Sequence, residues 1–376
     1  MVITASMKVT KVKVRNLGCS ENFMPKCSPV SGTTVLHISI ANIDANRIAA
    51  ARISQVWILR HMVIFFTNLA KKLVHLGLML SIMKETIQPI PSSELIINGD
   101  GSVFHLHLFP EDVADTVLLF GDQGRVEMFA GLLDTVEVRR QSREFFTVTG
   151  RSNGRRITAV STGIGTDNID IVMNELDALV NIDFKTRTVK SEHRRLTILR
   201  VGTCGAIQPD IPGGSVVFSE ISIGFDGVLN WYSGGEKIFI KDAEDSFVNY
   251  MNWPERYARP YFVRSAAALS SRFDGVAIKG MTVSSPGFYG PQGRSVRLGL
   301  TVPDLVDRMA GFRYGNLRIV NMEMESSALV GLATLLGHDS GTVCLVLANR
   351  YVKSMNTDYK ALMEDLLKKV LAISTE

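Results

Sequence analysis

Cysteine is scarce in this sequence. Only four cysteines occur among 376 residues, Cys19, Cys27, Cys204 and Cys344, and none belongs to a CxxC pair. This usage excludes a disulfide framework and is typical of proteins in a reducing compartment. We therefore expect a cytoplasmic protein.

Long uncharged apolar runs are also missing. The most apolar stretch, residues 56–83, is broken by charged side chains such as Arg60, Lys71 and Lys72. No uncharged run approaches the roughly 18 residues of a membrane-spanning helix. The stretch also lies too far from the first residue to serve as a signal peptide. We expect no membrane span, and an amphipathic surface helix around residues 60–80 stays open as an alternative.

A strong positive charge is absent from the main body of the chain. Residues 1–82 hold ten Lys and Arg against two acidic residues, so the remaining residues carry a net charge of −4 within a total of +4. We therefore expect no nucleic acid as a partner. We predict an atypical N-terminal extension over residues 1–82, outside the fold, and one domain over residues 83–376.

Short apolar runs alternate with helical patterns from about residue 100. DTVLLFG precedes RVEMFAGLLDTV, RRITAVSTG precedes DNIDIVMNELDALV, and YKALMEDLLKKVLAI closes the chain as an amphipathic helix. This alternation predicts an α/β fold in three layers, α/β/α, with a central mixed sheet. Ligands of such sheets bind in the loops after the strands.

Two glycine-containing segments are candidates for an anion site. In LRVGTCGAIQP we expect Arg200 at a strand end, followed by a turn with Thr203, which together offer a guanidinium fork, a hydroxyl and free amides. In FGDQGRVE, Gly121 precedes a helix expected to begin near Arg125. The alternative for Arg200 is a salt bridge to a neighbouring helix, and the alternative for FGDQGRVE is a plain tight turn between a strand and a helix.

Two further segments offer groups for an organic ligand. In NMEMESSA, Glu323 and Glu325 point the same way if the segment is extended, so both could accept hydrogen bonds from vicinal hydroxyls of a ligand. The alternative is that they are acidic residues at the start of a helix. In FYGPQGR, Phe288, Gln292 and Arg294 could stack on a planar ring and bond its edge, although surface loops also contain such residues by chance.

Three apparent motifs are set aside. GRSNG fits a nucleophile pattern, but a strand follows it, so we predict a β-hairpin. GIGTDN lacks the third glycine of a dinucleotide fingerprint. His105 and His107 lie on one face of an expected strand without further ligands at metal spacing, so we expect no metal site there.

Together these segments resemble the nucleoside phosphorylase family, and within it the uridine phosphorylases. The resemblance covers roughly residues 95–376 through eight ordered blocks: VFHLHL, FGDQGRVE, QSREF, VSTGIG, LRVGTCGAIQP, FYGPQGR, NMEMESSA and LANR. It implies phosphorolysis of uridine to uracil and ribose 1-phosphate, with inorganic phosphate as co-substrate and no cofactor. It further implies a homo-oligomer, with a dimer as the minimal unit and a hexamer as a further option.

The resemblance also implies roles for single residues, with Arg200, Thr203, Gln292 and Arg294 as the catalytic set. The phosphate ligands would be Gly121, Arg125, Arg200 and Thr203, together with Arg143 from a neighbouring subunit. The ribose would be held by Glu323, Met324 and Glu325, together with His105 from that neighbour, and the base by Phe288, Gln292, Arg294 and Arg350. An interface cation could sit near Glu144.

The sequence departs from the family at Gly124, His107 and Cys204, and Cys204 removes a hydroxyl. Purine enzymes of this fold carry an acid where this chain has Ala348-Asn349-Arg350, which favours a pyrimidine. A purine nucleoside phosphorylase, a nucleosidase that uses water and a non-catalytic nucleoside-binding relative remain the alternatives.

Overall fold

The computed structural model describes Lys72, residues 88–355 and residues 359–375. The predicted extension over residues 1–82 and the alternative of a surface helix around residues 60–80 lie outside the described residues, Lys72 aside. No helix among the described residues has the length and apolarity to cross a membrane.

Twelve strands form the main sheet: β1 (Thr116–Phe120), β2 (Thr135–Ser142), β3 (Phe145–Ser152), β4 (Arg155–Ser161), β7 (Thr197–Ala206), β8 (Val216–Gly224), β9 (Tyr261–Arg264), β10 (Ile278–Ser284), β11 (Arg313–Tyr314), β12 (Leu317–Glu323), β13 (Asp339–Asn349) and β14 (Ser354–Met355). A separate small pair is β5 (Ile182–Asp183) with β6 (Thr188–Val189).

The helices are α2 (Gln123–Ala130), α3 (Thr166–Asn181), α4 (Lys241–Met251), α5 (Ala267–Arg272), α6 (Leu305–Gly311), α7 (Ser326–Leu335) and α8 (Lys360–Thr375). Short 3-10 turns are η1 (Pro110–Asp112), η2 (Val228–Trp231), η3 (Gly235–Lys237) and η4 (Gly290–Gln292).

The sheet is mixed, as predicted. β4, β1, β7 and β13 are parallel neighbours, as are β8, β10 and β12, while β8 and β13 meet in antiparallel fashion. β12 also pairs with β7, through Asn321 opposite Ala206 and Met322 opposite Gly205. This last pairing closes five strands, β12, β10, β8, β13 and β7, into a ring.

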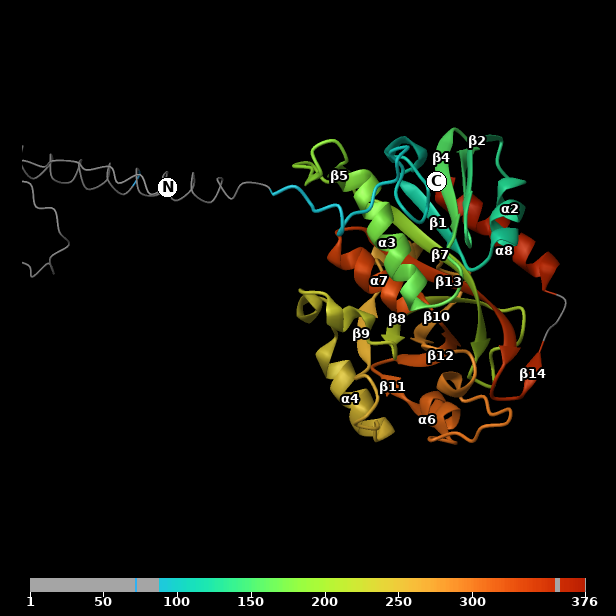
Figure 1. Ribbon diagram of the computed structural model, residues 1–376. Coiled ribbons are helices and arrows are strands. Elements are labelled where there is room, and N and C mark those ends of the chain that lie inside the picture. Colours follow the sequence, from blue (N-terminus) through green and yellow to red (C-terminus); the bar gives the residue numbers. More distant parts are fainter. Residues whose placement is uncertain (1–71, 73–87, 356–358, 376) are drawn as a thin grey trace, which may run out of the picture. The chain divides into compact units, whose positions relative to one another are not determined.

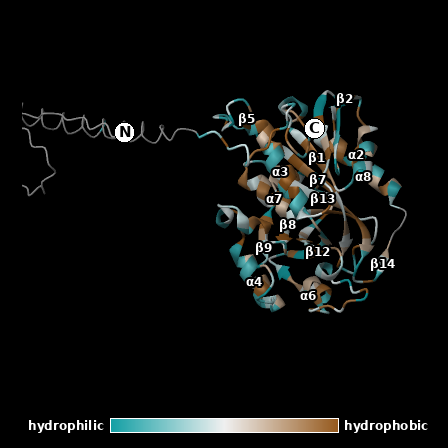
Figure 2. Ribbon diagram, viewed as in Figure 1, coloured by the Kyte–Doolittle hydropathy of each residue, from teal (hydrophilic) through white to brown (hydrophobic). Residues whose placement is uncertain are grey.

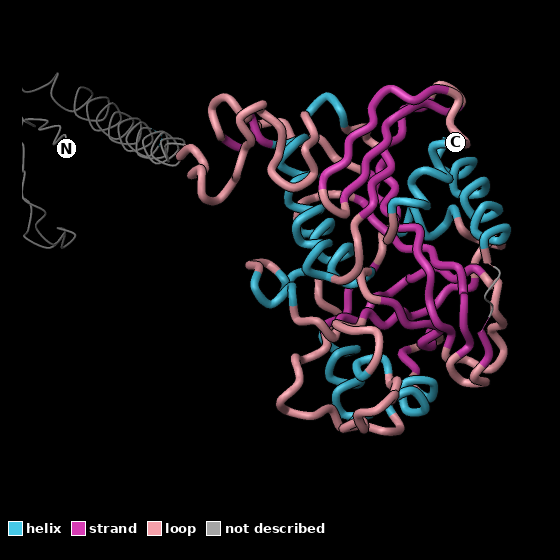
Figure 3. Tube along the Cα trace, turned by 45° about the vertical axis from the view of Figure 1, so that its right-hand side comes forward, coloured by secondary structure: helices cyan, strands magenta, loops and turns pink. Residues whose placement is uncertain are grey.

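Helices cover the β1 region of the sheet on both faces. α3 and α7 lie on one side and α2 and α8 on the other (Figure 1), and the tube view shows the same layers after rotation (Figure 3). β1 is buried on both faces: Val117 and Leu119 join the core beneath α3 and α7, whereas Leu118 and Phe120 join the core beneath α2 and α8. Successive side chains of a strand point to opposite faces of the sheet, so an unbroken apolar run packs against the helix layers on both faces. The three-layer prediction is confirmed.

The colouring by hydropathy agrees with this arrangement (Figure 2). The C-terminal helix α8 mixes hydrophilic and hydrophobic residues, as predicted, and it buries Met363, Leu366, Leu367 and Val370.

The predicted hairpin at GRSNG is also confirmed. β3 and β4 are antiparallel, and the two turn residues, Asn153 and Gly154, have φ angles of 48° and 75°. Left-handed residues of this kind match the twist of the paired strands.

Two local predictions are wrong. His105 and His107 lie in a turn rather than on one face of a strand. Arg200 does not end its strand, because β7 continues to Ala206, paired with β13 along its whole length. The helix expected near Arg125 begins two residues earlier, at Gln123.

Candidate active site

The glycines after Arg200 make room for arginine side chains and do not form a turn. A Cβ at Gly202 would lie 2.0 Å from Nη1 of Arg200, and one at Gly205 would lie 3.1 Å from Cγ of Arg350. Glycine in a strand commonly marks such a close approach. The sequence pattern was therefore informative about a site although the predicted turn was wrong.

Arg200 is buried and paired with both glutamates of NMEMESSA. Its Nη2 binds the carboxylate of Glu325, and its Nη1 lies 3.4 Å from Oε2 of Glu323. Burial acts to lower the pKa of Arg200, but the two carboxylates outweigh it and raise that pKa above its ordinary value. The guanidinium is therefore permanently charged. The ion-pair alternative for Arg200 is realised, with a partner at the start of α7.

The two glutamates meet at the junction of β12 and α7. Glu323 ends β12, and its carboxylate accepts hydrogen bonds from the backbone N–H groups of Glu325 (2.9 Å) and Ser326 (3.0 Å) and from the Ser284 hydroxyl (2.5 Å). Glu325 accepts from the N–H of Gly165 at 2.8 Å. The alternative of acids at a helix start is realised, because Glu323 accepts from N–H groups at the start of α7, and both glutamates also share Arg200; the grip on vicinal hydroxyls stays a prediction.

Burial raises the pKa of Glu323 to about 7. The charge of Arg200 opposes this rise and the charge of Glu325 adds to it. The Glu323 carboxyl therefore exchanges its proton within the neutral range.

Gly121 stands between two guanidinium groups. A Cβ at this position would lie 3.1 Å from Nη2 of Arg125 and 4.0 Å from Nη2 of Arg200. Asp122 holds Arg125 in place: its carboxylate accepts from the Arg125 backbone N–H at 3.0 Å, which caps α2, and it also binds Nε of Arg125. Two guanidinium groups beside a helix N-terminus are the kind of groups that bind anions in proteins, so this is the candidate anion site.

Thr203 and Met324 are the remaining predicted contacts on the segments that carry Arg200 and the glutamates. Thr203 is half-buried in β7, three residues after Arg200, and within the described part of the chain its hydroxyl has no hydrogen-bond partner. Met324 is half-buried between the two glutamates. Cys204 is buried in the same strand, and burial raises the pKa of its thiol well above the usual range.

The FYGPQGR loop is prearranged beside the glutamates. Arg294 donates from Nη1 to the carbonyl of Phe288 (2.6 Å) and to Oε1 of Gln292 (2.5 Å), and its guanidinium carbon lies 3.7 Å from the centre of the Phe288 ring. Gln292 is buried and donates to the carbonyl of Glu323 at 3.4 Å. This contact joins the loop of residues 288–294, called the base loop after its predicted role, to the end of β12.

Arg350 supports this loop from behind. It donates to the carbonyls of Gln292 (3.1 Å) and Gly293 (3.3 Å). Burial, and then the charge of Arg350, lower the pKa of Arg294 to about 10. The neighbouring Asn349 is fully occupied, because its amide donates to two backbone carbonyls and its oxygen accepts from two N–H groups.

Arg143 and His105 both lie near the ring of Phe104, and the Arg143 carbonyl accepts from the side-chain amide of Gln123 at the start of α2 (3.0 Å). Arg143 occupies the turn between β2 and β3 with a φ angle of 53°, and its guanidinium carbon lies 5.6 Å from the centre of the Phe104 ring. The His105 ring centre lies 4.8 Å from the same ring. The two residues predicted to act in a neighbouring subunit thus share one surface region. Glu144 is exposed in that turn, and in the described residues no group of three or more His, Cys, Asp or Glu side chains could hold a metal.

Several residues of the cluster were missed from the sequence. Asp122 could have been found, because an aspartate three residues before Arg125 is a helix-capping signal. A Cβ at Gly124 would lie 3.2 Å from Oδ1 of Asp122, so the departure at Gly124 leaves room for this cap. Ser284 and Gly165 reach the glutamates from distant parts of the chain, and no local pattern marks them.

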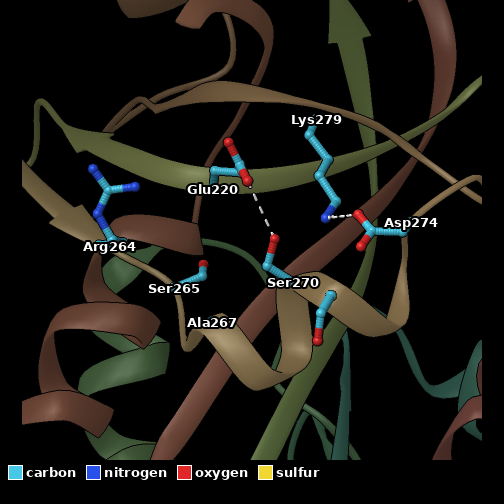
Figure 4. A pocket seen from close by; sticks show the side chains of 8 residues that line it. Glu220, Arg264, Ser265, Ala267, Ser270, Asp274 and Lys279 are labelled. Carbon is cyan, nitrogen blue, oxygen red and sulfur yellow. Dashed lines mark hydrogen bonds and ion pairs between the residues drawn. The ribbon is translucent and has the colours of Figure 1, made fainter. Parts of the chain in front are cut away.

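A surface hollow lies apart from this cluster, where Lys279 pairs with Asp274 and Ser270 donates to Glu220 (Figure 4). Its lining shares no residue with the predicted site. Its charged and hydroxyl groups largely satisfy one another, so the chemistry described above belongs to the Arg200 cluster.

Comparisons with known proteins agree with the resemblance. A uridine phosphorylase from Thermococcus kodakarensis is 30% identical over 267 residues, which cover 70% of this chain and 83% of that protein. A guanosine phosphorylase from Halorubrum lacusprofundi is 26% identical over 245 residues, or 65% of this chain and 83% of that protein. The crystal structure of a Trypanosoma brucei nucleoside phosphorylase with uridine phosphorylase activity superposes with a TM-score of 0.67 and 26% identity, covering 75% of this chain and 98% of that one.

The model of the phosphorylase superfamily matches residues 115–374, which is more than half of the sequence. Its span includes the Arg200 cluster and the base loop. The chain belongs to the phosphorylase superfamily.

Proposed function

We propose that this chain catalyses the phosphorolysis of uridine to uracil and ribose 1-phosphate. The observation that carries the proposal is the convergence of Arg125 and Arg200 at Gly121, with Arg200 also bound to Glu325. The Arg200 guanidinium thereby lies between the proposed anion site and two carboxylates that can accept hydrogen bonds from sugar hydroxyls.

Phosphate would bind between Arg125 and Arg200, with the free Thr203 hydroxyl as a further donor. Positioned guanidinium groups turn the encounter with phosphate into an oriented step. Phosphate attacks the anomeric carbon of ribose while the glycosidic bond breaks, so the protein needs no nucleophile of its own.

Ribose would lie against Glu325 and Met324. The carboxylate of Glu325 can accept hydrogen bonds from sugar hydroxyls. Glu323 already accepts several hydrogen bonds within the protein, so its role is to hold Glu325 and the start of α7.

Uracil would stack near Phe288 and meet Gln292 and Arg294. The departing base carries negative charge on its carbonyl oxygens, which donors bind more strongly than they bind neutral uridine. The nearby Asn349 is committed to backbone groups, and no acid stands beside it in Ala348-Asn349-Arg350. These features support a pyrimidine base.

We further propose that the site is completed by a second copy of the chain. Arg143 and His105 share one surface region, and the three atoms nearest a Cβ at Gly121 come from Arg125, Gly163 and Arg200. A neighbouring subunit that presents this region would add both residues to one site, which requires at least a dimer.

The test is the loss of uridine absorbance at varied phosphate concentration, with inosine assayed in parallel. The proposal expects uridine turnover that depends on phosphate and is replaced by arsenolysis when arsenate is added. Turnover without phosphate would identify a nucleosidase, and binding without turnover a non-catalytic relative. A preference for inosine would identify a purine enzyme, the alternative favoured by the similarity to a guanosine phosphorylase.

A further inference from the structure

We propose that Glu175 is the positioning residue for His105, and that it serves the ribose site through the His105 imidazole. This inference rests on the proposed function, in which His105 contacts the ribose of a neighbouring site. Glu175 lies on α3, seventy residues from the turn that carries His105.

The carboxylate of Glu175 binds this turn at three donors. Oε1 and Oε2 accept from the backbone N–H of His105 at 2.9 and 3.1 Å, and Oε2 accepts from the N–H of Leu106 at 2.9 Å. Oε1 also lies 2.6 Å from Nδ1 of His105. The Glu175 side chain is only 12% exposed, whereas His105 is 26% exposed. The acid is therefore an internal support and the imidazole is the group that can meet a ligand.

The short contact determines which ring nitrogen carries hydrogen. An ionised carboxylate is an acceptor only, so Nδ1 of His105 must be the donor. In the neutral ring Nε2 is then an acceptor, free to receive a hydrogen bond from a sugar hydroxyl. The ring is also packed edge to face against Phe104 (4.8 Å) and Phe145 (6.4 Å), which limits its rotation. Carboxylates fix histidines in this way beside metal sites.

Glu175→Gln separates the two functions of this carboxylate. The amide oxygen can still accept from the backbone N–H groups, so the turn keeps its support. The amide NH₂, however, is a donor, and the tautomer with hydrogen on Nε2 then becomes the favoured one. We expect KM for uridine to rise up to about tenfold, as for one lost hydrogen bond between neutral groups, with KM for phosphate unchanged.

The decisive measurement is a double-mutant cycle. If Glu175 acts through the imidazole, adding Glu175→Gln to His105→Ala leaves KM for uridine at the His105→Ala value. Independent, additive effects, or an equal rise of KM for phosphate, would overturn the proposal. Nitrogen-15 NMR of the His105 ring should show hydrogen on Nδ1 in the unsubstituted protein and on Nε2 in Glu175→Gln.

A matched control lies on the same helix. Oδ1 of Asp177 lies 3.2 Å from Nε2 of His338, which is a second carboxylate and histidine pair outside the predicted site. Asp177→Asn should leave KM for uridine unchanged. If the unsubstituted protein shows no uridine phosphorolysis, the proposed function fails. The NMR comparison still shows whether Glu175 sets the His105 tautomer, so the two failures are distinguishable.

Discussion

Two regions of the predicted site differ in construction. The Arg200 cluster is buried, with Arg200 4% exposed and Glu323 and Glu325 each 3% exposed, and its residues stand on strands or at a strand–helix junction. Arg143 and His105 instead occupy surface turns. A single chain therefore prearranges the buried cluster on its own, whereas the two surface residues would join the site only under the proposed assembly of two chains.

The largest expected effect comes from removing the centre of the buried region. Arg200→Ala leaves Glu323 and Glu325 without their cation and removes a proposed phosphate ligand. The transition state should lose roughly 2–5 kcal/mol of stabilisation, so kcat/KM for uridine should fall roughly 30- to 5,000-fold. Arg195→Ala, which removes an exposed arginine paired with Asp339, is the control and should retain activity. Near-normal phosphorolysis by Arg200→Ala would refute the phosphate assignment.

The buried region should also give stability an unusual pH dependence. The pKa of Glu323 is raised from 4.5 to about 7, so the folded state holds an extra proton between these values. Stability from this group is complete below about pH 4.5 and is lost as the pH rises through about 7. Urea unfolding from pH 5 to 8 should show a loss on the order of 3 kcal/mol that Glu323→Gln lacks. Identical pH profiles for the two proteins would contradict this prediction.

The base loop is predicted to contribute mainly in the transition state. Arg294→Ala should lower kcat for uridine about 10²-fold, as when one oxyanion donor is removed. Steady-state kinetics should show a smaller change in KM. Arg308→Ala, which removes an exposed arginine on α6, provides the comparison. An effect confined to KM would mean that Arg294 binds the ground state only.

The surface turns can be tested by mixing defective chains. Arg143→Ala removes a contribution to the neighbouring site, and Arg294→Ala damages the chain's own site. Mixed dimers would then contain one intact site, so random assembly should restore about a quarter of the unsubstituted activity. Recovery should require unfolding and refolding the two chains together. No recovery would place all these residues in one chain.

The layers could be predicted from the sequence because the buried face of each strand or helix determines the spacing of apolar residues within a short stretch of chain. The resemblance implied that Arg200, Glu323 and Gln292 belong to one site, and in the structure Glu323 lies 3.4 Å from each of the other two side chains. The prediction of a turn after Arg200 was wrong. The glycines there leave space for the side chains of Arg200 and Arg350, and a local sequence pattern does not show such packing.

The roles of Ser284, Gly165 and Glu175 could not be predicted for a related reason. Each meets its partner across at least 39 residues of chain, so only the folded topology brings the groups together. The assignment of Arg143 and His105 to a neighbouring subunit stays a prediction, since it concerns a second chain.

The pairing of β12 with β7 has a consequence for how products leave. Arg200 and Glu323 stand on strands that are hydrogen-bonded to each other within a closed ring. Widening the gap between these strands would break ladder bonds and tear the ring open. Under the proposed function, ribose 1-phosphate would therefore leave through motion of the connecting loops, while the strands of the ring keep their pairing.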